Sequence, residues 1–361
     1  MCFYLAHLTS KTLPFKYQKG FVAILILVIV SLSAVGFIFD LMNSSSIKEV
    51  RLNQTGKALV QAKEALIGFS VGSDTMPGTL PCPDRTNDGV SDSCSASSSI
   101  GRLPWKTLGL SDLRDGDGEC LWYALSPVYR NIITTAQRGT NISRPALNST
   151  TAGSITVLNE QAVALPAPIN KVIAVIIAPG SPLVGQSRAN LGSTVCGGNI
   201  TASNYLDLSN LFNNATGNRV GNNLSFIMGK VDGSFNDRLA YIMQEDLYAP
   251  LRKRISREMM GNFGVFKGVY AYYQNKAQYP CSASSAVTAA QDCATMSGYV
   301  GYIPYLDVDV KYTSLGAWLI NNEWFGLTSY VYTTPTRVSL TVMGGTLTSS
   351  CAANAAVVTC N

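Results

Sequence analysis

KGFVAILILVIVSLSAVGFIF, residues 19–39, decides how the N-terminal part of this chain is expected to fold. From Phe21 to Phe39 the stretch has nineteen residues and no charged side chain. A helix of that length extends over about 28 Å, close to the hydrocarbon thickness of a bilayer. Lys11, Lys16 and Lys19 precede it, and basic residues favour the cytoplasmic side. The stretch predicts a transmembrane helix over 21–41, with the rest of the chain across the membrane.

The junction Lys19-Gly20-Phe21 leaves three interpretations of the N-terminus open. A cleaved secretory signal would use a small-residue site such as Ala34-Val35-Gly36, and an uncleaved signal anchor would keep the whole N-terminus. A glycine between a basic leader and an apolar helix instead resembles the class III leader of type IV prepilins and type II secretion pseudopilins. The resemblance implies that a prepilin peptidase removes residues 1–20, cutting between Gly20 and Phe21, and that Phe21 is methylated. Leu25 stands where that family usually has glutamate, as in a subset of minor pseudopilins at the filament tip.

Composition limits the function of the remaining chain. Apolar residues make up 47% and charged residues 14%, which is typical of a β-containing body with many turns. The formal net charge is +5, with three of the positive charges in the leader, so there is no electrostatic case for nucleic acid. The only histidine is His7, also in the leader, and the mature chain would therefore lack the commonest general base. We expect a protein that is not an enzyme, has no catalytic residues and needs no cofactor, calcium excepted.

The cysteines point to disulfides. There are nine, without a CxxC pair, and loss of the leader removes Cys2 and leaves eight. An even number behind a membrane segment favours disulfides and an oxidising compartment.

Two parts of the body repeat one pattern. Leu80-Pro81-Cys82-Pro83, Cys94, the Gly101–Trp105 element and Leu121–Ser126 correspond to Tyr279–Ser282, Cys293, Gly301–Tyr305 and Glu323–Thr328. The offset is 199 at both cysteines, 200 at the Gly-x-x-Pro element and 202 at the Trp-aromatic element, which indicates an internal duplication. Equivalent positions should form equivalent bonds, so the pattern predicts Cys82–Cys94 and Cys281–Cys293. Cys351–Cys360 follows as a C-terminal clip, and Cys120–Cys196 by elimination.

Hydrophobic patterns indicate further elements. Period-3.6 spacing predicts helices over 47–69 and 245–275, and apolar runs predict strands over 171–178, 224–231 and 238–243, the last two around an Asp232-Gly233 turn. The order helix, proline, loop, Gly-x-x-Pro and aromatic strand resembles the globular part of pseudopilins. With IGRLPWKTLGL and DLRDGDGECLWYALSP, the whole chain is similar to a group of uncharacterised proteobacterial prepilin-like proteins.

These observations predict an α+β fold, in which a transmembrane helix continues as an amphipathic helix and precedes a disulfide-rich body of two pilin-like helix-plus-antiparallel-sheet units. The expected parts are a cleaved leader (1–20), the transmembrane helix (21–41), a first pilin-like unit (42–135), a central β-rich segment (136–243) and a second pilin-like unit (244–361).

Two acidic loops are candidate calcium sites. Asp84, Asp88 and Asp92 with Gly89 match the start of a calcium loop, although Thr86 and Ser95 replace two of its usual ligands. The bland alternative is a polar turn clipped by Cys82–Cys94. Acids also crowd the turn that contains Asp112, Asp115, Asp117 and Glu119, where a cation, solvent, or a salt bridge to Arg102 or Arg114 would relieve their repulsion.

The resemblance implies a minor pilin or pseudopilin, a non-catalytic component of a type IV pilus or type II secretion filament. Its partners would be the prepilin peptidase, other pilins through the N-terminal helix, and the bacterial inner membrane. The body would be periplasmic or carried into a surface filament. The alternative is a permanently membrane-anchored periplasmic binding or adhesion module.

Overall fold

The computed structural model divides the chain into two compact units, Met1–Leu52 and Asn53–Asn361. It describes residues 19–94, 99–130, 147–165, 172–188, 196, 198–208, 213–218, 220, 223–261, 268–285, 299–304, 308, 316–343 and 348–361. Residues 1–18, with Lys11 and Lys16, and the expected boundary between residues 135 and 136 lie outside this description.

The first unit is described by the N-terminal part of α1 (Lys19–Gly72), a single helix of 54 residues. The helix expected over 47–69 is present as the C-terminal part of α1, which belongs to the second unit from Asn53 onward. There it buries Ala58, Leu59, Ala62 and Leu66, which recur at helical spacing, so one face of α1 joins the core.

The structure corrects the prediction of a transmembrane helix. Within the part of the chain that the structure describes, no helix combines the length and the apolar character that crossing a bilayer requires. The span over 21–41 and the single-pass inner-membrane localisation that depended on it are therefore wrong.

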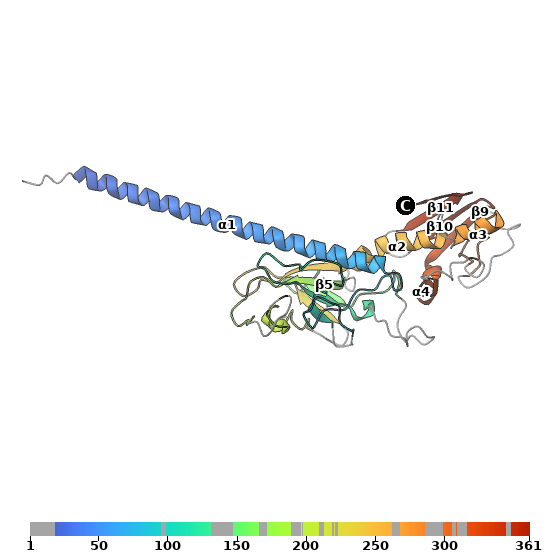
Figure 1. The fold of residues 1–361 in the computed structure, drawn as a ribbon, viewed down its shortest axis with the longest axis horizontal. Helices are drawn as coiled ribbons and strands as arrows, with labels where there is room; N and C mark the ends of the chain where they lie inside the picture. The colour runs from blue at the N-terminus through green and yellow to red at the C-terminus, as the bar shows by residue number, and fades with distance from the viewer. Residues whose placement is uncertain are drawn as a thin grey trace, which may run out of the picture. The chain divides into compact units, whose positions relative to one another are not determined.

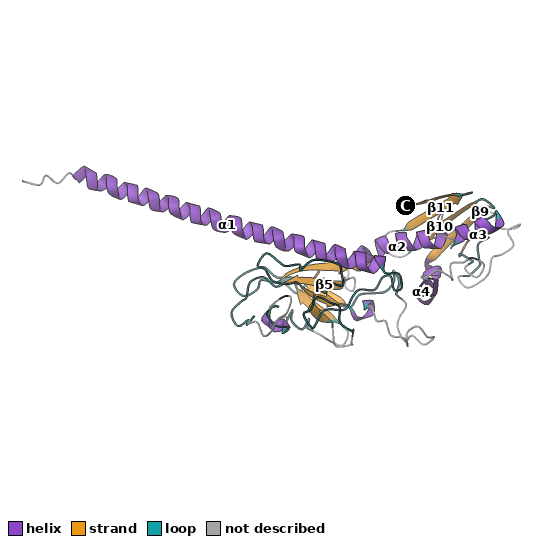
Figure 2. Cartoon of the chain, viewed as in Figure 1, coloured by secondary structure: helices purple, strands orange, loops and turns teal. Residues whose placement is uncertain are grey.

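The body consists mostly of strands, arranged in two sheets (Figures 1 and 2). One sheet contains β1 (Ile100–Arg102), β2 (Trp122–Leu125), β3 (Ile155–Leu158), β4 (Ala164–Leu165), β5 (Val172–Ala178), β6 (Leu224–Ile227) and β7 (Arg238–Met243). The other contains β8 (Tyr299–Gly301), β9 (Thr328–Thr334), β10 (Arg337–Val342), β11 (Ser349–Asn354) and β12 (Val357–Cys360), in the order β12-β11-β10-β9-β8.

β5 organises the first sheet. Its sequence VIAVIIA is buried at every residue, because a strand that is apolar on both faces is stable only between two covering layers. β2, β3 and β7 all pair with it in antiparallel register. The strands predicted over 224–231 and 238–243 are present as β6 and β7, but they pair with different neighbours. β6 runs parallel to β3, and β7 pairs with β5.

This arrangement corrects the expected fold class. The first sheet is mixed and takes strands from both the expected first unit and the expected central segment, so the body is not built of two pilin-like units. The two copies of the repeat share one feature: Asp84 bridges Arg102, and Ala283 bridges Tyr302, at equivalent positions. They differ at the aromatic element, because Trp122 begins β2 whereas Trp324 begins the 3-10 helix η6 (Trp324–Leu327).

The helix expected over 245–275 is two helices. α2 (Gln244–Met260) ends at Gly261, whose φ of 77° lies in the left-handed region that favours glycine. α3 (Val269–Lys276) starts after Gly268, where an added Cβ would lie 2.7 Å from the carbonyl oxygen of Met259. Two glycines therefore break a pattern that periodicity alone predicts as continuous.

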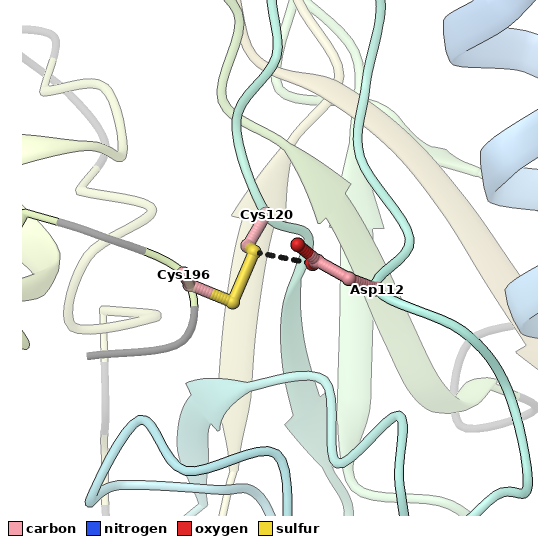
Figure 3. A group of neighbouring side chains, drawn as sticks. All are labelled: Asp112, Cys120 and Cys196. Carbon is pink, nitrogen blue, oxygen red and sulfur yellow. Dashed lines mark hydrogen bonds between the residues drawn. A yellow bond between two sulfur atoms is a disulfide. The ribbon is translucent and has the colours of Figure 1, made fainter.

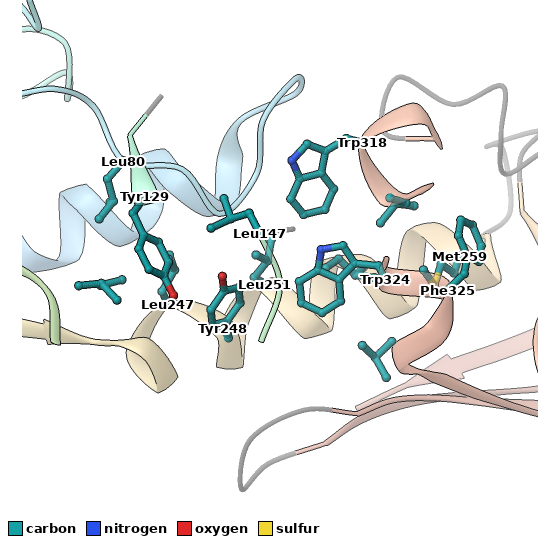
Figure 4. Packing of buried hydrophobic residues seen from close by; sticks show 14 of the residues in the cluster. Leu80, Tyr129, Leu147, Leu247, Tyr248, Leu251, Met259, Trp318, Trp324 and Phe325 are labelled. Atoms are coloured by element: carbon teal, nitrogen blue, oxygen red, sulfur yellow. The ribbon is translucent and has the colours of Figure 1, made fainter. Parts of the chain in front are cut away.

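α2 packs against β10 and β11 of the second sheet and carries the core that links the two sheets (Figure 1). Figure 4 shows Tyr248 of α2 between Tyr129 of η1 (Pro127–Tyr129) and Trp324. The ring centroids lie 6.2 Å and 5.9 Å from that of Tyr248. Trp318 of α4 (Gly316–Asn321) continues the row at 6.0 Å from Trp324. This continuous aromatic core explains why residues from Asn53 onward form one compact unit.

Three disulfides are present in the described residues, between the same cysteines that the sequence pairs. Cys82–Cys94, Cys120–Cys196 and Cys351–Cys360 have Cα–Cα distances of 5.5, 5.8 and 4.1 Å. Cys281 is also disulfide-bonded, and its expected partner Cys293 lies outside the described residues.

Candidate functional site

The apolar segment, Ile24–Val30 of α1, is the first candidate. Its seven consecutive side chains are all apolar and all exposed, from 48% at Val28 to 71% at Leu27. Seven residues cover almost two turns, so the apolar side chains surround the helix instead of forming one stripe. Gly20 and Phe21, the expected processing site, lie just before the segment in the first turn of α1.

The first acidic loop is organised around a buried carboxylate. Asp84 Oδ1 accepts the backbone N–H groups of Asn87 at 2.6 Å and Thr86 at 3.0 Å, and Oδ2 accepts that of Gly89 at 2.7 Å. Burial raises the pKa of Asp84, and these backbone bonds oppose the rise. Asp92 Oδ2 accepts the N–H groups of Arg85 and Thr86, and Asp88 Oδ1 accepts that of Val90. The three acids thus cap their own turn.

The second acidic turn also uses its acids on separate partners. Asp115 is fully buried, and its carboxylate accepts the backbone N–H groups of Asp117, Glu119 and Gly180, each at 2.9 Å. Burial raises the pKa of Asp115 against these bonds. Since Gly180 follows β5 and the Gly116 N–H donates to Thr55 of α1 at 2.9 Å, the turn is fastened to both a strand and a helix. Asp115 is therefore a structural centre of the turn.

Two other acids of this turn, Asp112 and Glu119, pair with arginines. Asp112 forms a salt bridge with Arg114 at 2.6 Å, and Arg114 is one of the two arginines that the sequence offered as partners. Glu119 forms a salt bridge with Arg188 at 3.1 Å. Asp117 also takes part in an interaction of its own. Asp115 and Glu119 do not join Asp112 in any group of possible metal ligands among the described residues.

One such group does occur in the described residues: Asp112, Cys120 and Cys196, whose ligand atoms lie within 4.8 Å of one another. Figure 3 shows why it is a poor metal centre, because Cys120 and Cys196 are joined as a disulfide and Asp112 Oδ1 lies 3.2 Å from Cys120 Sγ. Metals bind the thiolate, and neither sulfur offers one while the bond is intact.

The structure yields a prediction for calcium. Addition of millimolar calcium to the chelator-treated protein is expected to leave the melting temperature unchanged, because the carboxylates of Asp84 and Asp115 are already used by backbone N–H groups. Thermal unfolding in chelator and in a calcium series measures this. A melting temperature that rises steadily with free calcium would contradict it, and Asp84→Asn and Asp112→Asn variants would show which loop holds the ion.

The arginine stack, formed by Trp122, Arg102, Tyr205 and Arg188, lies beside the Cys120–Cys196 disulfide. The Arg102 guanidinium carbon lies 4.4 Å from the ring centroid of Trp122 and 4.0 Å from that of Tyr205, and that of Arg188 lies 4.8 Å from Tyr205. Arg102 is 1% exposed and donates to the Cys120 carbonyl at 2.9 Å. Burial lowers the pKa of Arg102 to about 10. The guanidinium groups of Arg102 and Arg188 thus connect the turn that carries Cys120 to the 198–208 segment.

Sequence reasoning missed most of this cluster. The sequence indicates Arg102 only as an alternative partner for the acidic turn, and Arg188 and Tyr205 carry no local signal of the stack. Stacking of an arginine between aromatic rings has no fixed sequence spacing, so only the folded chain shows it.

Comparison of the chain with protein-family models, with curated proteins and with solved structures gave no significant match.

Proposed function

We propose that the chain is a non-catalytic structural subunit of a filament of the type IV pilus or type II secretion kind, assembled through the apolar segment. The observation that carries the proposal is the exposure of Ile24–Val30 on every side of α1. A helix that is apolar all round is stable only when it is surrounded. Neighbouring helices of the same kind surround it in the proposed filament, each fully buried side chain contributing about 1.5–3 kcal/mol relative to exposure.

The partners follow from this proposal. Other pilin-like subunits, including further copies of this chain, supply the surrounding helices. A prepilin peptidase cuts between Gly20 and Phe21, so that Ile24, the first residue of the apolar segment, becomes the fourth residue of the mature chain. Removal of the lysines before Phe21 also removes charges that would repel one another where the helices meet.

The body supports a structural role. The buried acids of the two candidate calcium loops, Asp84 and Asp115, are engaged as caps of backbone N–H groups. The only histidine is His7, within the proposed leader. Disulfides hold the turns of the body in place, as suits a subunit that works outside a reducing compartment.

Site-specific photocrosslinking tests this assembly. A photoreactive residue at Val30, 59% exposed, is expected to give a ladder of crosslinked pilin-like subunits in cells of the native host. The matched position is Val60, the same residue type on the same helix, 55% exposed but beside the buried Leu59 in the body. Val60 should give little or no ladder, and the products from Val30 should begin at Phe21.

Leu27→Lys places a charge among the helices and should abolish the Val30 ladder, because burying an unpaired charge is costly. Equal ladders from Val30 and Val60, or Val30 products that contain no pilin-like subunit, would exclude assembly through the apolar segment.

A further inference from the structure

Two buried aspartates near the first sheet each accept a hydrogen bond from the backbone N–H group of the other. Asp207 and Asp237 are each 1% exposed. The Asp207 N–H donates to Asp237 Oδ2 at 2.8 Å, and the Asp237 N–H donates to Asp207 Oδ2 at 2.7 Å. Asp207 Oδ2 also accepts the Asn236 N–H at 2.5 Å. This carboxyl pair, Asp207 and Asp237, joins the 198–208 segment to the start of β7.

The remaining oxygens of the carboxyl pair differ in their partners. Asp207 Oδ1 accepts the amide of Gln186 at 3.1 Å, and Asp237 Oδ2 accepts that of Asn214 at 2.9 Å. Asp237 Oδ1 is buried and has no hydrogen-bond partner among the residues that the structure describes. A buried ionised carboxylate with an unpaired oxygen is strongly disfavoured, whereas a neutral carboxyl group leaves only an uncharged polar group unpaired, at a much smaller cost.

The charges around the carboxyl pair distinguish its two members. Arg188, on the segment that also carries Gln186, acts on both carboxyl groups and favours their ionised forms, but it also pairs with Glu119. The neighbouring 213–218 segment contributes the neutral Asn214. The single positive charge of Arg188 is already shared with Glu119 and cannot also neutralise two buried carboxylates. One carboxyl group of the pair should therefore stay neutral.

We propose that the carboxyl pair holds a single proton at neutral pH, carried by Asp237, and that its loss at alkaline pH loosens the junction between the 198–208 segment and β7. Asp207 is the ionised member, since its oxygens accept three hydrogen bonds. A calcium ion is a weaker explanation of the pair. Calcium takes six to eight oxygen ligands, and three of the four carboxyl oxygens here already accept N–H groups.

The sign of the pH effect follows from Asp237. Burial, and then the charge of Asp207, raises the pKa of Asp237 well above its usual value. Below a pH of about 4 both the folded and the unfolded chain carry this proton. Above a pH of about 4 the unfolded chain releases this proton while the folded chain still holds it. The contribution of Asp237 to the free energy of unfolding therefore falls as pH rises, until the pH reaches the pKa of Asp237 in the folded chain.

Asp237→Asn isolates this contribution. The amide oxygen of asparagine replaces Oδ2, which accepts two bonds, and its NH₂ group replaces the unpaired Oδ1, so the variant keeps the shape and stays neutral. The ratio of the unfolding equilibrium constants, wild type over Asp237→Asn, is expected to rise roughly tenfold per pH unit, or roughly a hundredfold from pH 5 to pH 7. Urea unfolding of the full chain over that range measures the ratio.

Asp207→Asn is the matched control. Its NH₂ group would face the Gln186 amide, donor against donor, so it should destabilise the chain at every pH. An infrared carbonyl band of a protonated carboxyl group, seen at pH 7 in the wild type and absent in Asp237→Asn, would report the proton directly. Hydrogen exchange at the Asp207 and Asp237 amides should accelerate with alkaline pH more in the wild type than in Asp237→Asn.

Three results would overturn the proposal: a ratio that does not change with pH, no protonated-carboxyl band at pH 7, or a calcium-dependent stabilisation that Asp237→Asn removes.

Discussion

Replacing Cys120 and Cys196 together by alanine is expected to lower the free energy of unfolding by about 4 kcal/mol. In the chain-entropy model, stabilisation grows with the length of the loop that the disulfide closes, and this bond joins residues 76 positions apart. It also holds the turn that contains Asp115 and the Arg102 contact at the Cys120 carbonyl. Urea unfolding of the oxidised wild type and the double variant, followed by tryptophan fluorescence, measures the loss.

Cys351 and Cys360 provide the control for loop length. Their bond closes a separation of only 9 residues between the paired strands β11 and β12. The double alanine variant at these positions is expected to lose about 3 kcal/mol. A loss at Cys351–Cys360 that equals or exceeds the loss at Cys120–Cys196 would contradict an effect that depends on loop length.

Arg102→Ala is expected to lower the free energy of unfolding by about 3 kcal/mol, comparable with truncation of a large core residue. The stem and the guanidinium of Arg102 fill the space between Trp122 and Tyr205, so alanine leaves a cavity as well as an unpaired Cys120 carbonyl. Denaturant unfolding measures the change, and near-ultraviolet circular dichroism reports the packing of the two rings.

Two further variants separate packing from charge. Arg102→Met keeps an unbranched side chain between the rings and is expected to recover about half of the loss, because it also removes the cost of burying a charge. Arg85→Ala, at an exposed arginine of the neighbouring loop, should change stability by less than about 0.5 kcal/mol. If Arg102→Ala were as mild as Arg85→Ala, the arginine stack would have no structural role.

The apolar run shows how a correct local prediction can support a wrong conclusion. The run is helical, as its composition predicts, and it lies in α1. Its length and preceding lysines also matched a membrane span, but in the described residues no helix meets that requirement. A run of apolar residues indicates that its surface is to be buried away from water, but it does not indicate whether lipid or protein buries it.

Local sequence signals determined the elements that depend on near neighbours. The sequence VIAVIIA predicts the buried strand β5, helical spacing predicts the C-terminal part of α1, and the duplicated cysteine spacing predicts Cys82–Cys94. These predictions hold because periodicity and short-loop closure are set by residues close together in the chain.

Only the tertiary structure decided which strands share a sheet and which polar groups meet. β6 pairs with β3 and β7 with β5, although the turn between β6 and β7 favours a hairpin. Arg102 meets Tyr205, and Asp207 meets Asp237, across 103 and 30 positions of the sequence. Such contacts depend on burial, since a buried charge or N–H group must find a partner wherever the fold places one. Neither the spacing nor the composition of the chain specifies that partner.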